Sequence, residues 1–383
     1  MNVPSFSVVV IARNEAAKLP ALFASLQEFL SAGGEVVVVD TASEDDTVRV
    51  ARAAGARVER VGFRFHSVLT EAQAAQITAK FSRDGAGQLV EAGQKIFDFG
   101  SARNFAGTLA SNEVVWHIDA SDVVLTADLA FLDAEVRRGD VAAFDYMLRL
   151  GGASFNVIRF FDRRVYTWRG RVHEAPFARG AMAGRRVVCS ESQLSLRHLR
   201  GEKPRHYLAG LALDAIADAA MPRWKHYVGR ELFYERRYRS ALVPLRAHTR
   251  TKDAWFVERA ASHCLIANCL EALGRPDLAA ESFFRAARVD PSRREPLLQL
   301  AWLCQRQGDF QGSVTFAAAA LTIPGAARVI DAESHYTFDP HAILYWGLFW
   351  LGRRAEATTH WETCLRMAPE NEKFQEDARL FAK

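Results

Sequence analysis

The chain has 383 residues, a formal net charge of +4, 49% hydrophobic residues and 25% charged residues. This length allows two domains, and the composition is that of an ordinary globular protein. The small net charge and the short, interrupted basic stretches argue against a nucleic-acid-binding protein, whose domains usually carry dense basic patches.

The five cysteines are an odd number and show no CxxC spacing, which indicates buried free thiols and a reducing compartment. The N-terminus lacks the basic and apolar regions of a signal peptide, and no apolar run approaches the roughly 18 residues of a membrane-spanning helix. We therefore expect a cytoplasmic protein without a transmembrane segment. Peripheral contact with a membrane stays open.

The first forty residues predict a β-α-β unit. Residues 6–11 are a continuous apolar run, as in a strand that is buried on both faces. A helical stripe of apolar residues follows over 19–30. A second apolar strand over 35–39 leads into Asp40.

The alternation of helices and strands continues to about residue 161, apart from an interruption at about 62–97 that we interpret as an insertion. Alternating strands and helices predict a mostly parallel sheet with helices on both faces. The further elements that we expect are a helix over 47–54, a strand over 58–61, a helical piece over 71–80, a helix over 101–110 and strands over 114–118, 142–150 and 155–161.

After about residue 203 only helical patterns remain, and they repeat. Gly274 and Gly308 lie 34 residues apart and open similar phrases, and Gly352 opens a third phrase. A proline follows each glycine after 16 or 17 residues. Because 34 residues is the tetratricopeptide period, we expect three to four stacked helix pairs. The predicted domains are therefore 1–202 and 203–383.

Polar residues follow the first two predicted strands. Arg13, Asn14 and Glu15 form the loop after the first strand, where ligands bind in open α/β sheets; a solvated turn is the alternative. Asp40 can accept hydrogen bonds from a ribose hydroxyl or a base N–H, and the alternative is a polar cluster that caps the next helix. Both can hold at once, with Asp40 for the nucleotide and Ser43 or Asp45 for the cap.

Two later features carry charge. Arg103 lies in the first turn of the helix predicted over 101–110, and its guanidinium geometry suits a diphosphate. A surface salt bridge is the alternative. Asp119 and Asp122 end an apolar strand, and closely spaced carboxylates suit Mg²⁺ or Mn²⁺. Acidic strand ends are also common without a metal.

Taken together, these stretches resemble glycosyltransferase family 2, which has the GT-A fold. They read SVVVIARNE (7–15), EVVVVDTASEDDT (35–47), FGSARNFA (99–106) and WHIDASD (116–122). The chain looks most like the branch that ends in tetratricopeptide repeats. That branch carries a further phrase, which here reads IRFFDRR (158–164) and then WRGRVHE (168–174).

The resemblance implies an enzyme that moves a sugar from a nucleoside diphosphate sugar to an acceptor with inversion. The residues expected to bind the nucleotide-sugar are Arg13, Asn14, Glu15, Asp40, Ser43, Arg103 and Asn104. The expected ligands of a divalent cation are Asp119, Asp122 and His173. Glu174 is the first choice for the general base, and Asp122 is the second.

One position departs from the family. Where the family commonly has Asp-Ala-Asp-Glu, this chain has Asp119-Ala120-Ser121-Asp122. Either Asp122 replaces the missing carboxylate, through water for example, or Asp119 and His173 alone hold the Mg²⁺ or Mn²⁺ ion. Dependence on a metal therefore stays open.

Two other functions compete with an active glycosyltransferase. Ser121 favours an inactive nucleotide-binding scaffold whose repeats bind a protein partner, whereas the intact His173-Glu174 pair argues against it. A dinucleotide-dependent dehydrogenase is excluded because no GxGxxG follows the first strand. The acceptor can be a polypeptide, a glycan or a lipid-linked molecule.

Overall fold

The computed structural model describes residues 3–85, 87–151, 153–180, 184–199, 207–325 and 331–381. By the contacts among its residues the chain divides into two compact units. The α/β unit comprises Met1–Ala74 and Val90–Asp214, and the helical unit comprises Ala75–Leu89 and Ala215–Lys383. The predicted boundary between residues 202 and 203 falls outside the described residues and stays a prediction.

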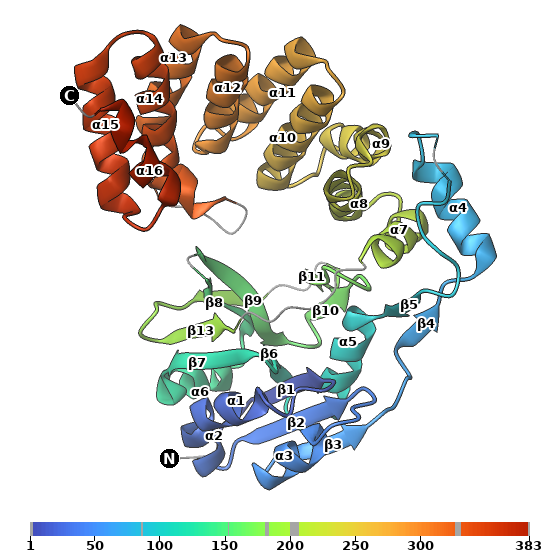
Figure 1. Ribbon diagram of the computed structural model, residues 1–383. Helices are drawn as coiled ribbons and strands as arrows, with labels where there is room; N and C mark the ends of the chain where they lie inside the picture. Colours follow the sequence, from blue (N-terminus) through green and yellow to red (C-terminus); the bar gives the residue numbers. More distant parts are fainter. Residues whose placement is uncertain are drawn as a thin grey trace. The chain divides into compact units, whose positions relative to one another are not determined.

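The α/β unit is built on one nine-stranded sheet (Figure 1). The strands follow the order β3-β2-β1-β6-β9-β8-β13-β7. Strand β12 also pairs with β8, along the first half of β8, whereas β13 pairs with the second half. Five of the pairings are parallel and three are antiparallel. The strands are β1 (Ser7–Ala12), β2 (Glu35–Asp40), β3 (Arg57–Arg60), β6 (Val114–Asp119), β7 (Asp122–Ala127), β8 (Val141–Leu150), β9 (Ala153–Asp162), β12 (Arg185–Val188) and β13 (Leu194–His198).

Helices cover both faces of this sheet. Alternate residues of each strand point to opposite faces, so Val8 and Val10 pack into one core and Val9 into another. The larger core contains residues of α1 (Leu19–Ser25), α2 (Gln27–Ser31), α3 (Thr47–Ala53) and α6 (Leu129–Arg137). The smaller core contains residues of α5 (Phe99–Leu109), which lies on the other side of the sheet from α1 and α2 (Figure 1).

Shorter elements complete this unit. The strands β10 (Tyr166–Arg169) and β11 (Ala175–Ala178) form an antiparallel pair. The predicted insertion contains a second antiparallel pair, β4 (His66–Val68) and β5 (Lys95–Phe97), with α4 (Glu71–Phe81) between them. Residues 75–89 of this insertion belong to the helical unit, so the chain leaves the α/β unit and returns to it.

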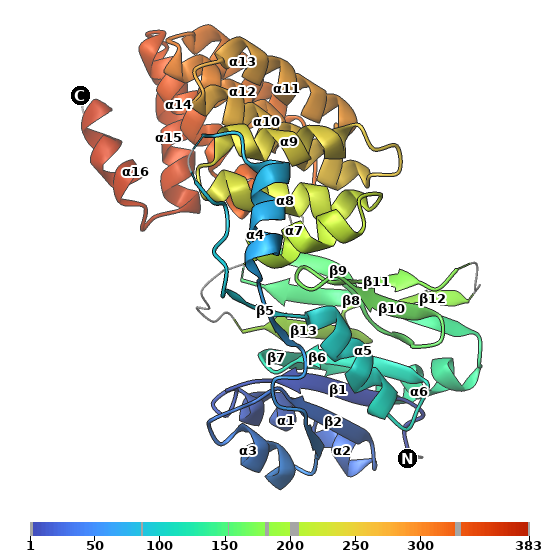
Figure 2. The same ribbon diagram turned by 90° about the vertical axis from the view of Figure 1, so that its right-hand side faces the viewer.

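The helical unit is a series of helical hairpins. Figure 2 shows α8 beside α9, α10 beside α11, α12 beside α13 and α14 beside α15, and successive hairpins also contact one another. The helices are α7 (Leu208–Ala217, which crosses into this unit), α8 (Pro222–Tyr234), α9 (Tyr238–Thr249), α10 (Phe256–Ala272), α11 (Pro276–Val289), α12 (Glu295–Arg306), α13 (Phe310–Leu321), α14 (Asp339–Trp350), α15 (Arg354–Met367) and α16 (Glu372–Glu376), with short 3₁₀ turns at Glu333–Tyr336 and Asp377–Leu380.

The turns inside the hairpins explain the repeated glycines. Gly274, Gly308 and Gly352 have φ values of 72°, 79° and 75°, and each lies between the two helices of one hairpin. Glycine adopts this left-handed conformation without steric cost, so it ends the first helix of each pair. In the first hairpin the corresponding turn residue is Arg236, with a φ of 58°. The first repeat, the least regular in sequence, thus has an arginine at the turn where the later repeats have glycine.

The start of α9 is capped by the insertion. The carboxylate of Asp84 accepts hydrogen bonds from the backbone N–H groups of Arg239 and Ser240, at 3.1 and 3.0 Å. The side chain of Arg237, the N-cap residue of α9, forms no cap bond of its own. A helix leaves its first N–H groups without intrahelical partners, so Asp84 supplies from a distant part of the sequence what a local cap normally provides.

These observations confirm the predicted fold class, an α/β domain with a mostly parallel sheet followed by helical repeats. The five cysteines are free thiols, and all except Cys304 are buried. Within the described ranges, none of the helices combines the length and the apolar character that crossing a membrane requires.

Candidate active site

Three strands bring the predicted site residues to one edge of the sheet. Strand β1 pairs in parallel with both β2 and β6, so their carboxyl ends meet. In this register Ala12 lies opposite Asp40, and Ile11 lies opposite Asp119. The loop that contains Arg13, Asn14 and Glu15 therefore begins between the two aspartates, as expected for a ligand site in an open α/β sheet.

The loops after β1 and β2 are joined by hydrogen bonds. The backbone N–H of Asn14 donates to Ser43 Oγ at 2.9 Å, and Asn14 Oδ1 accepts from the N–H of Glu44 at 2.8 Å. Asn14 and Ala42 have φ values of 54° and 71°, which residues other than glycine rarely adopt. Such strained residues concentrate at ligand sites, where the surrounding structure holds them in place.

The other two residues of the first loop have different surroundings. The N–H of Glu15 donates to Thr47 Oγ1 at 2.8 Å, and its buried carboxylate forms an ion pair with Lys18 at 2.7 Å. Arg13 Nη1 lies 2.9 Å from His66 Nε2, and its guanidinium stacks over the ring of Phe63. Glu15 therefore supports the loop, whereas Arg13 connects the loop to the start of the insertion.

A cavity of about 390 Å³ opens beside this loop pair. Its size falls within the range of small-molecule sites. Its walls come from the ends of β2 and β3 and from the first residues of the insertion, and they are Asp40, Ala42, Ser43, Glu44, Arg60, Gly62 and Phe63. Asp40 is buried, and Arg60 lies 3.7 Å from its carboxylate, whereas 55% of Phe63 is exposed. The cavity thus combines two carboxylates, one hydroxyl group, a guanidinium and an aromatic face.

Helix α5 carries Arg103 toward the second aspartate. Asp98 caps the helix by accepting the N–H of Ser101 at 2.9 Å. Gly100 allows the helix to approach the segment after β10 closely, because a Cβ at this position would lie 2.5 Å from the carbonyl oxygen of Gly170. The sequence Phe-Gly-Ser-Ala-Arg therefore places the arginine one turn into a helix that is fixed against its neighbour.

Arg103 joins two carboxylates. Its Nη2 donates to Asp119 Oδ1 at 2.6 Å, and its Nε donates to Glu174 Oε1 at 2.8 Å. Its guanidinium also stacks over the ring of Trp168, 4.9 Å from the centroid, and only 6% of the side chain is exposed. The proposed base Glu174 and the proposed metal ligand Asp119 are thereby held side by side.

Asn104, the next residue, bonds to the backbone instead. Its Nδ2 donates to the carbonyl of Trp168, and its Oδ1 accepts the N–H of the same residue, both at 2.9 Å. Thr167 Oγ1 also donates to Asn104 Oδ1, at 3.2 Å. Both polar atoms of the amide are thus engaged with β10, so Asn104 fixes the strand that carries Trp168 beneath Arg103.

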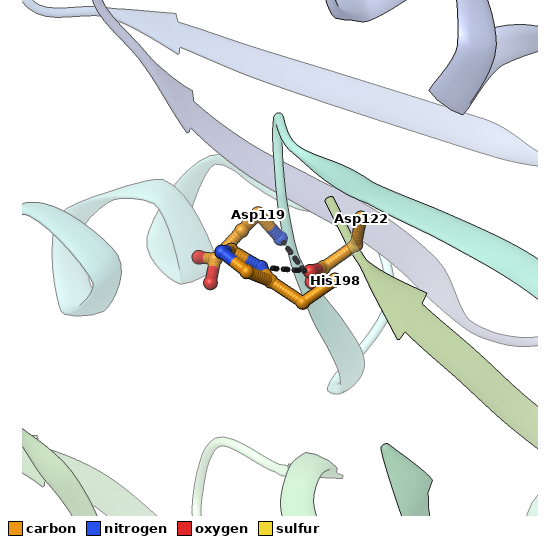
Figure 3. A group of neighbouring side chains, drawn as sticks. All are labelled: Asp119, Asp122 and His198. Atoms are coloured by element: carbon orange, nitrogen blue, oxygen red, sulfur yellow. Dashed lines mark hydrogen bonds and ion pairs between the residues drawn. The ribbon is translucent and has the colours of Figure 1, made fainter. Parts of the chain in front are cut away.

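Asp119, Asp122 and His198 form a compact group (Figure 3). One ligand atom from each lies within 4.8 Å of the others. Asp122 Oδ2 accepts the N–H of Asp119 at 3.0 Å, and Asp122 Oδ1 lies 2.6 Å from His198 Nδ1. Strand pairing explains the contact, because His198 at the end of β13 lies opposite Asp122 at the start of β7.

A second arginine, Arg159, enters this group from β9. Its Nη1 lies 2.7 Å from Asp119 Oδ2 and 3.4 Å from Asp122 Oδ2. The side chain of Arg159 is 24% exposed, whereas that of Asp122 is fully buried. We call Asp119, Asp122, Glu174, Arg103, Arg159 and His198 the acidic cluster.

Charge pairing sets the protonation states in this cluster. Burial by itself raises the pKa of Asp119, but the positive charges of Arg103 and Arg159 outweigh it and hold that pKa well below its usual range. The hydrogen bond with Asp122 raises the pKa of His198. Burial, and then the two guanidinium charges, push the pKa of the neighbouring His117 well below its usual value. Asp119 is therefore ionised at neutral pH, and His117 is a neutral imidazole.

His173 lies elsewhere in this region. Its φ is 51°, again in the left-handed range, and its ring contacts the edge of Tyr207 with the centroids 5.2 Å apart. Among the described residues, the histidine that groups with the two aspartates is His198. His173 is therefore not part of this group, and its role as a metal ligand stays a prediction.

The cluster fits a divalent cation in its donor chemistry. Carboxylates and an imidazole suit Mn²⁺ or a similar ion, and so few protein ligands leave positions for substrate oxygens. Because Asp122 engages Nδ1 of His198, Nε2 is the ring nitrogen that can bind a cation, an arrangement common around metal-binding histidines. Asp119 Oδ2 and His198 Nε2 are the donors that such an ion would meet first.

Sequence reasoning missed His198 and Arg159. Arg159 lies in the phrase IRFFDRR that supported the resemblance, yet three arginines in seven residues gave no reason to choose it. His198 ends a strand of alternating polar and apolar residues, LSLRH, which is a detectable β pattern. The pairing of that strand with β7 is a long-range contact, and it alone brings His198 to Asp122.

Comparison with known proteins supports part of this assignment. Residues 7–79 match the family model described as Glycosyl transferase family 2, which supports a glycosyltransferase-type function in general terms. This stretch includes Arg13, Asn14, Glu15, Asp40 and Ser43. No curated protein matches the chain.

Several solved structures are similar to part of the chain. They include PilW, a "widely conserved type IV pilus biogenesis factor" (11% identity, TM-score 0.38, covering 44% of this chain and 72% of that one). They also include Pseudomonas aeruginosa pilF (15%, 0.36, 44% and 71%) and YrrB, "a TPR protein with an unusual peptide-binding site" (13%, 0.35, 45% and 81%). The helical-repeat architecture itself rests on the hairpins and turn glycines described above.

Proposed function

We propose that the α/β unit transfers a sugar from a nucleoside diphosphate sugar to an acceptor, with inversion at the anomeric carbon. The observation that carries this proposal is the bridge from Arg103 to both Asp119 and Glu174, at the same sheet edge as the loops that match the family model. This bridge holds together an ionised carboxylate, a candidate base and a guanidinium that suits phosphate. The same sheet edge carries the cavity that is lined by Asp40.

Each side chain has a distinct part in the proposed reaction. Asp40 and Ser43 bind the nucleoside through hydrogen bonds, and Phe63 offers a face on which a base can stack. Glu174 removes the proton of the acceptor as the acceptor attacks the anomeric carbon. Arg103 orients Glu174 and stabilises the negative charge that develops on the leaving diphosphate.

A divalent cation, Mg²⁺ or Mn²⁺, would be held by Asp119 and His198, with Asp122 orienting the imidazole. When bound, the ion would supply additional positive charge against the leaving diphosphate. In this proposal Ser121 is not a defect, because His198 provides the ligand that the second aspartate provides elsewhere in the family.

The test is a screen of nucleotide-sugar hydrolysis, run with and without Mn²⁺, together with the thermal shift caused by UDP, GDP, dTDP and CDP. We expect one nucleotide to raise the melting temperature and the matching nucleotide-sugar to be hydrolysed slowly. The variant Asp119→Asn should weaken nucleotide binding at least about tenfold and abolish the response to Mn²⁺. A chain that no nucleotide stabilises and that hydrolyses no nucleotide-sugar would instead be a scaffold whose repeats bind a partner.

The acceptor is proposed only by class. A polypeptide, a glycan and a lipid-linked molecule each supply a nucleophile for this reaction. Helical repeats commonly bind polypeptides along a concave surface, which makes a polypeptide the first acceptor to assay once the donor is known.

A further inference from the structure

We propose that Arg159 occupies the cation position beside Asp119 Oδ2 in the nucleotide-free protein, and that a divalent cation displaces it when the nucleotide binds. The inference rests on the proposed function, since it concerns the cation and the diphosphate of that reaction. It makes Arg159 a positioning residue that couples the binding of the cation to the binding of the donor.

The contacts of Arg159 overlap with those of a cation. Its Nη1 lies 2.7 Å from Asp119 Oδ2 and 3.4 Å from Asp122 Oδ2. Those aspartates, together with His198, form the candidate metal group among the described residues. A cation on Asp119 Oδ2 would lie within a few ångströms of the guanidinium, and the two positive charges would repel each other strongly in this partly buried setting. The two cannot share this carboxylate oxygen.

Arg159, and not Arg103, is the residue that can move. The side chain of Arg103 is 6% exposed and is held by Glu174, by Asp119 and by the ring of Trp168. The side chain of Arg159 is 24% exposed, and both of its ion pairs, with Asp119 and Asp122, come from the single atom Nη1. Tyr146 and Glu174 interact with it electrostatically as well. Displacing Arg159 therefore breaks the ion pairs of one nitrogen atom, whereas displacing Arg103 breaks those of two nitrogen atoms and a stacking contact with Trp168.

The charge balance explains why the nucleotide should matter. Three carboxylates and two guanidinium groups leave the cluster with one net negative charge, before any charge on His198 is counted. A divalent cation alone would make the cluster positive, so binding is weak while Arg159 remains close. A diphosphate adds at least two negative charges and gives the displaced guanidinium a partner of suitable geometry. The cation and the nucleotide should therefore strengthen each other's binding by the same factor.

The experiment measures Mn²⁺ binding without any nucleotide, by titration calorimetry or by the spin resonance of free Mn²⁺. We expect Arg159→Gln to bind Mn²⁺ at least about tenfold more tightly than the wild-type chain, because the competing charge is gone. The matched control is Arg149→Gln, which removes an exposed arginine that pairs with Glu191 outside the cluster. It should leave Mn²⁺ affinity unchanged. The added change Asp119→Asn should abolish the tighter binding.

Unchanged or weaker Mn²⁺ affinity in a folded Arg159→Gln variant overturns the inference. If that variant does not fold, Arg159→Lys replaces it, because lysine keeps a charge but lacks the planar fork that spans two oxygens. The lysine variant should bind Mn²⁺ several-fold more tightly than wild type, and equal affinity again overturns the inference. Since no nucleotide is present, tighter Mn²⁺ binding with no nucleotide-sugar turnover would refute the proposed function and leave the role of Arg159 intact.

Discussion

Two clusters of buried titratable groups reduce the energetic cost of burying charge in opposite ways. The acidic cluster of the α/β unit keeps its charges and compensates them with one another. The second cluster, which we call the histidine cluster, consists of His226, His248 and Ser262 in the helical unit. There the Nδ1 atoms of both histidines lie 2.8 Å from Ser262 Oγ, and all three side chains are buried.

The protonation states follow from these surroundings. Burial, followed by nearby positive charges, lowers the pKa of His248 to about 4 and holds that of His226 well below its usual value. A single hydroxyl serves both rings, because it donates to one imidazole nitrogen and accepts from the N–H of the other. The histidine cluster is thus neutral, which suits packing, whereas the acidic cluster concentrates charge at a strand edge, which suits chemistry.

The largest expected effect tests the chemical side of this comparison. Replacing Glu174 by Gln keeps a side-chain oxygen that can accept from Arg103, so the fold should persist while the base is lost. We expect transfer to fall by about 10²- to 10⁴-fold, the usual contribution of a general base, with little change in nucleotide affinity. The measurement is single-turnover transfer with the donor found in the screen.

Its matched control is Glu191→Gln, which removes an exposed carboxylate in the turn between β12 and β13, outside the acidic cluster. That variant should retain wild-type transfer. Full activity in Glu174→Gln would remove Glu174 from the reaction and leave Asp122 as the remaining candidate base.

The next effect contrasts the two clusters by their response to acid. A histidine whose pKa is lowered by folding contributes stability above its unfolded pKa of about 6.5, and that stability is lost as the pH falls below this value. For His248, the change from about 6.5 to about 4 corresponds to a loss on the order of 3 kcal/mol across that window. His198 behaves oppositely: its pKa is raised, so its contribution is present below about 6.5 and is lost as the pH rises through the raised value.

Hydrogen exchange followed by mass spectrometry at pH 7 and pH 5, corrected for intrinsic rates, checks this contrast. Peptides from α8 to α10 should lose protection in mild acid, while peptides from β6 keep theirs. His248→Gln should reduce the acid sensitivity of the helices. A larger loss of protection in β6 than in α8 to α10 at pH 5 would contradict this prediction.

The smallest effect concerns the shared hydroxyl. Ser262→Ala leaves both imidazole Nδ1 atoms without that partner in a buried site, and we expect a loss of about 1–3 kcal/mol in the free energy of unfolding. Ser282→Ala is the control, because Ser282 is buried too but forms a single hydrogen bond, to the carbonyl of His263 at 3.2 Å. It should cost about 1 kcal/mol or less, as measured by denaturant unfolding. Equal losses in the two variants would show that a hydroxyl shared by two rings contributes no more to the free energy of unfolding than one with a single hydrogen bond.

Local signals in the sequence were sufficient to predict several strands, helices and turns. The apolar runs of β1 and β2 are long enough to identify strands buried on both faces. The turn glycines marked three helical hairpins, because a left-handed turn strongly favours glycine. Asp40, Arg103, Asp119 and Glu174 were found as parts of ordered motifs, and the mostly parallel sheet follows from the alternation of strands and helices.

The contacts between side chains from distant segments, by contrast, could not be predicted from the sequence. His198 reaches Asp122 because β13 pairs with β7 across 76 residues of sequence, and the sequence carries no local trace of that pairing. Arg159 reaches the same aspartates from β9. Asp84 caps α9 from an insertion more than 150 residues earlier in the chain. Local patterns follow from backbone conformation and burial, whereas these contacts depend on strand order and on the path of the chain, which are properties of the whole fold.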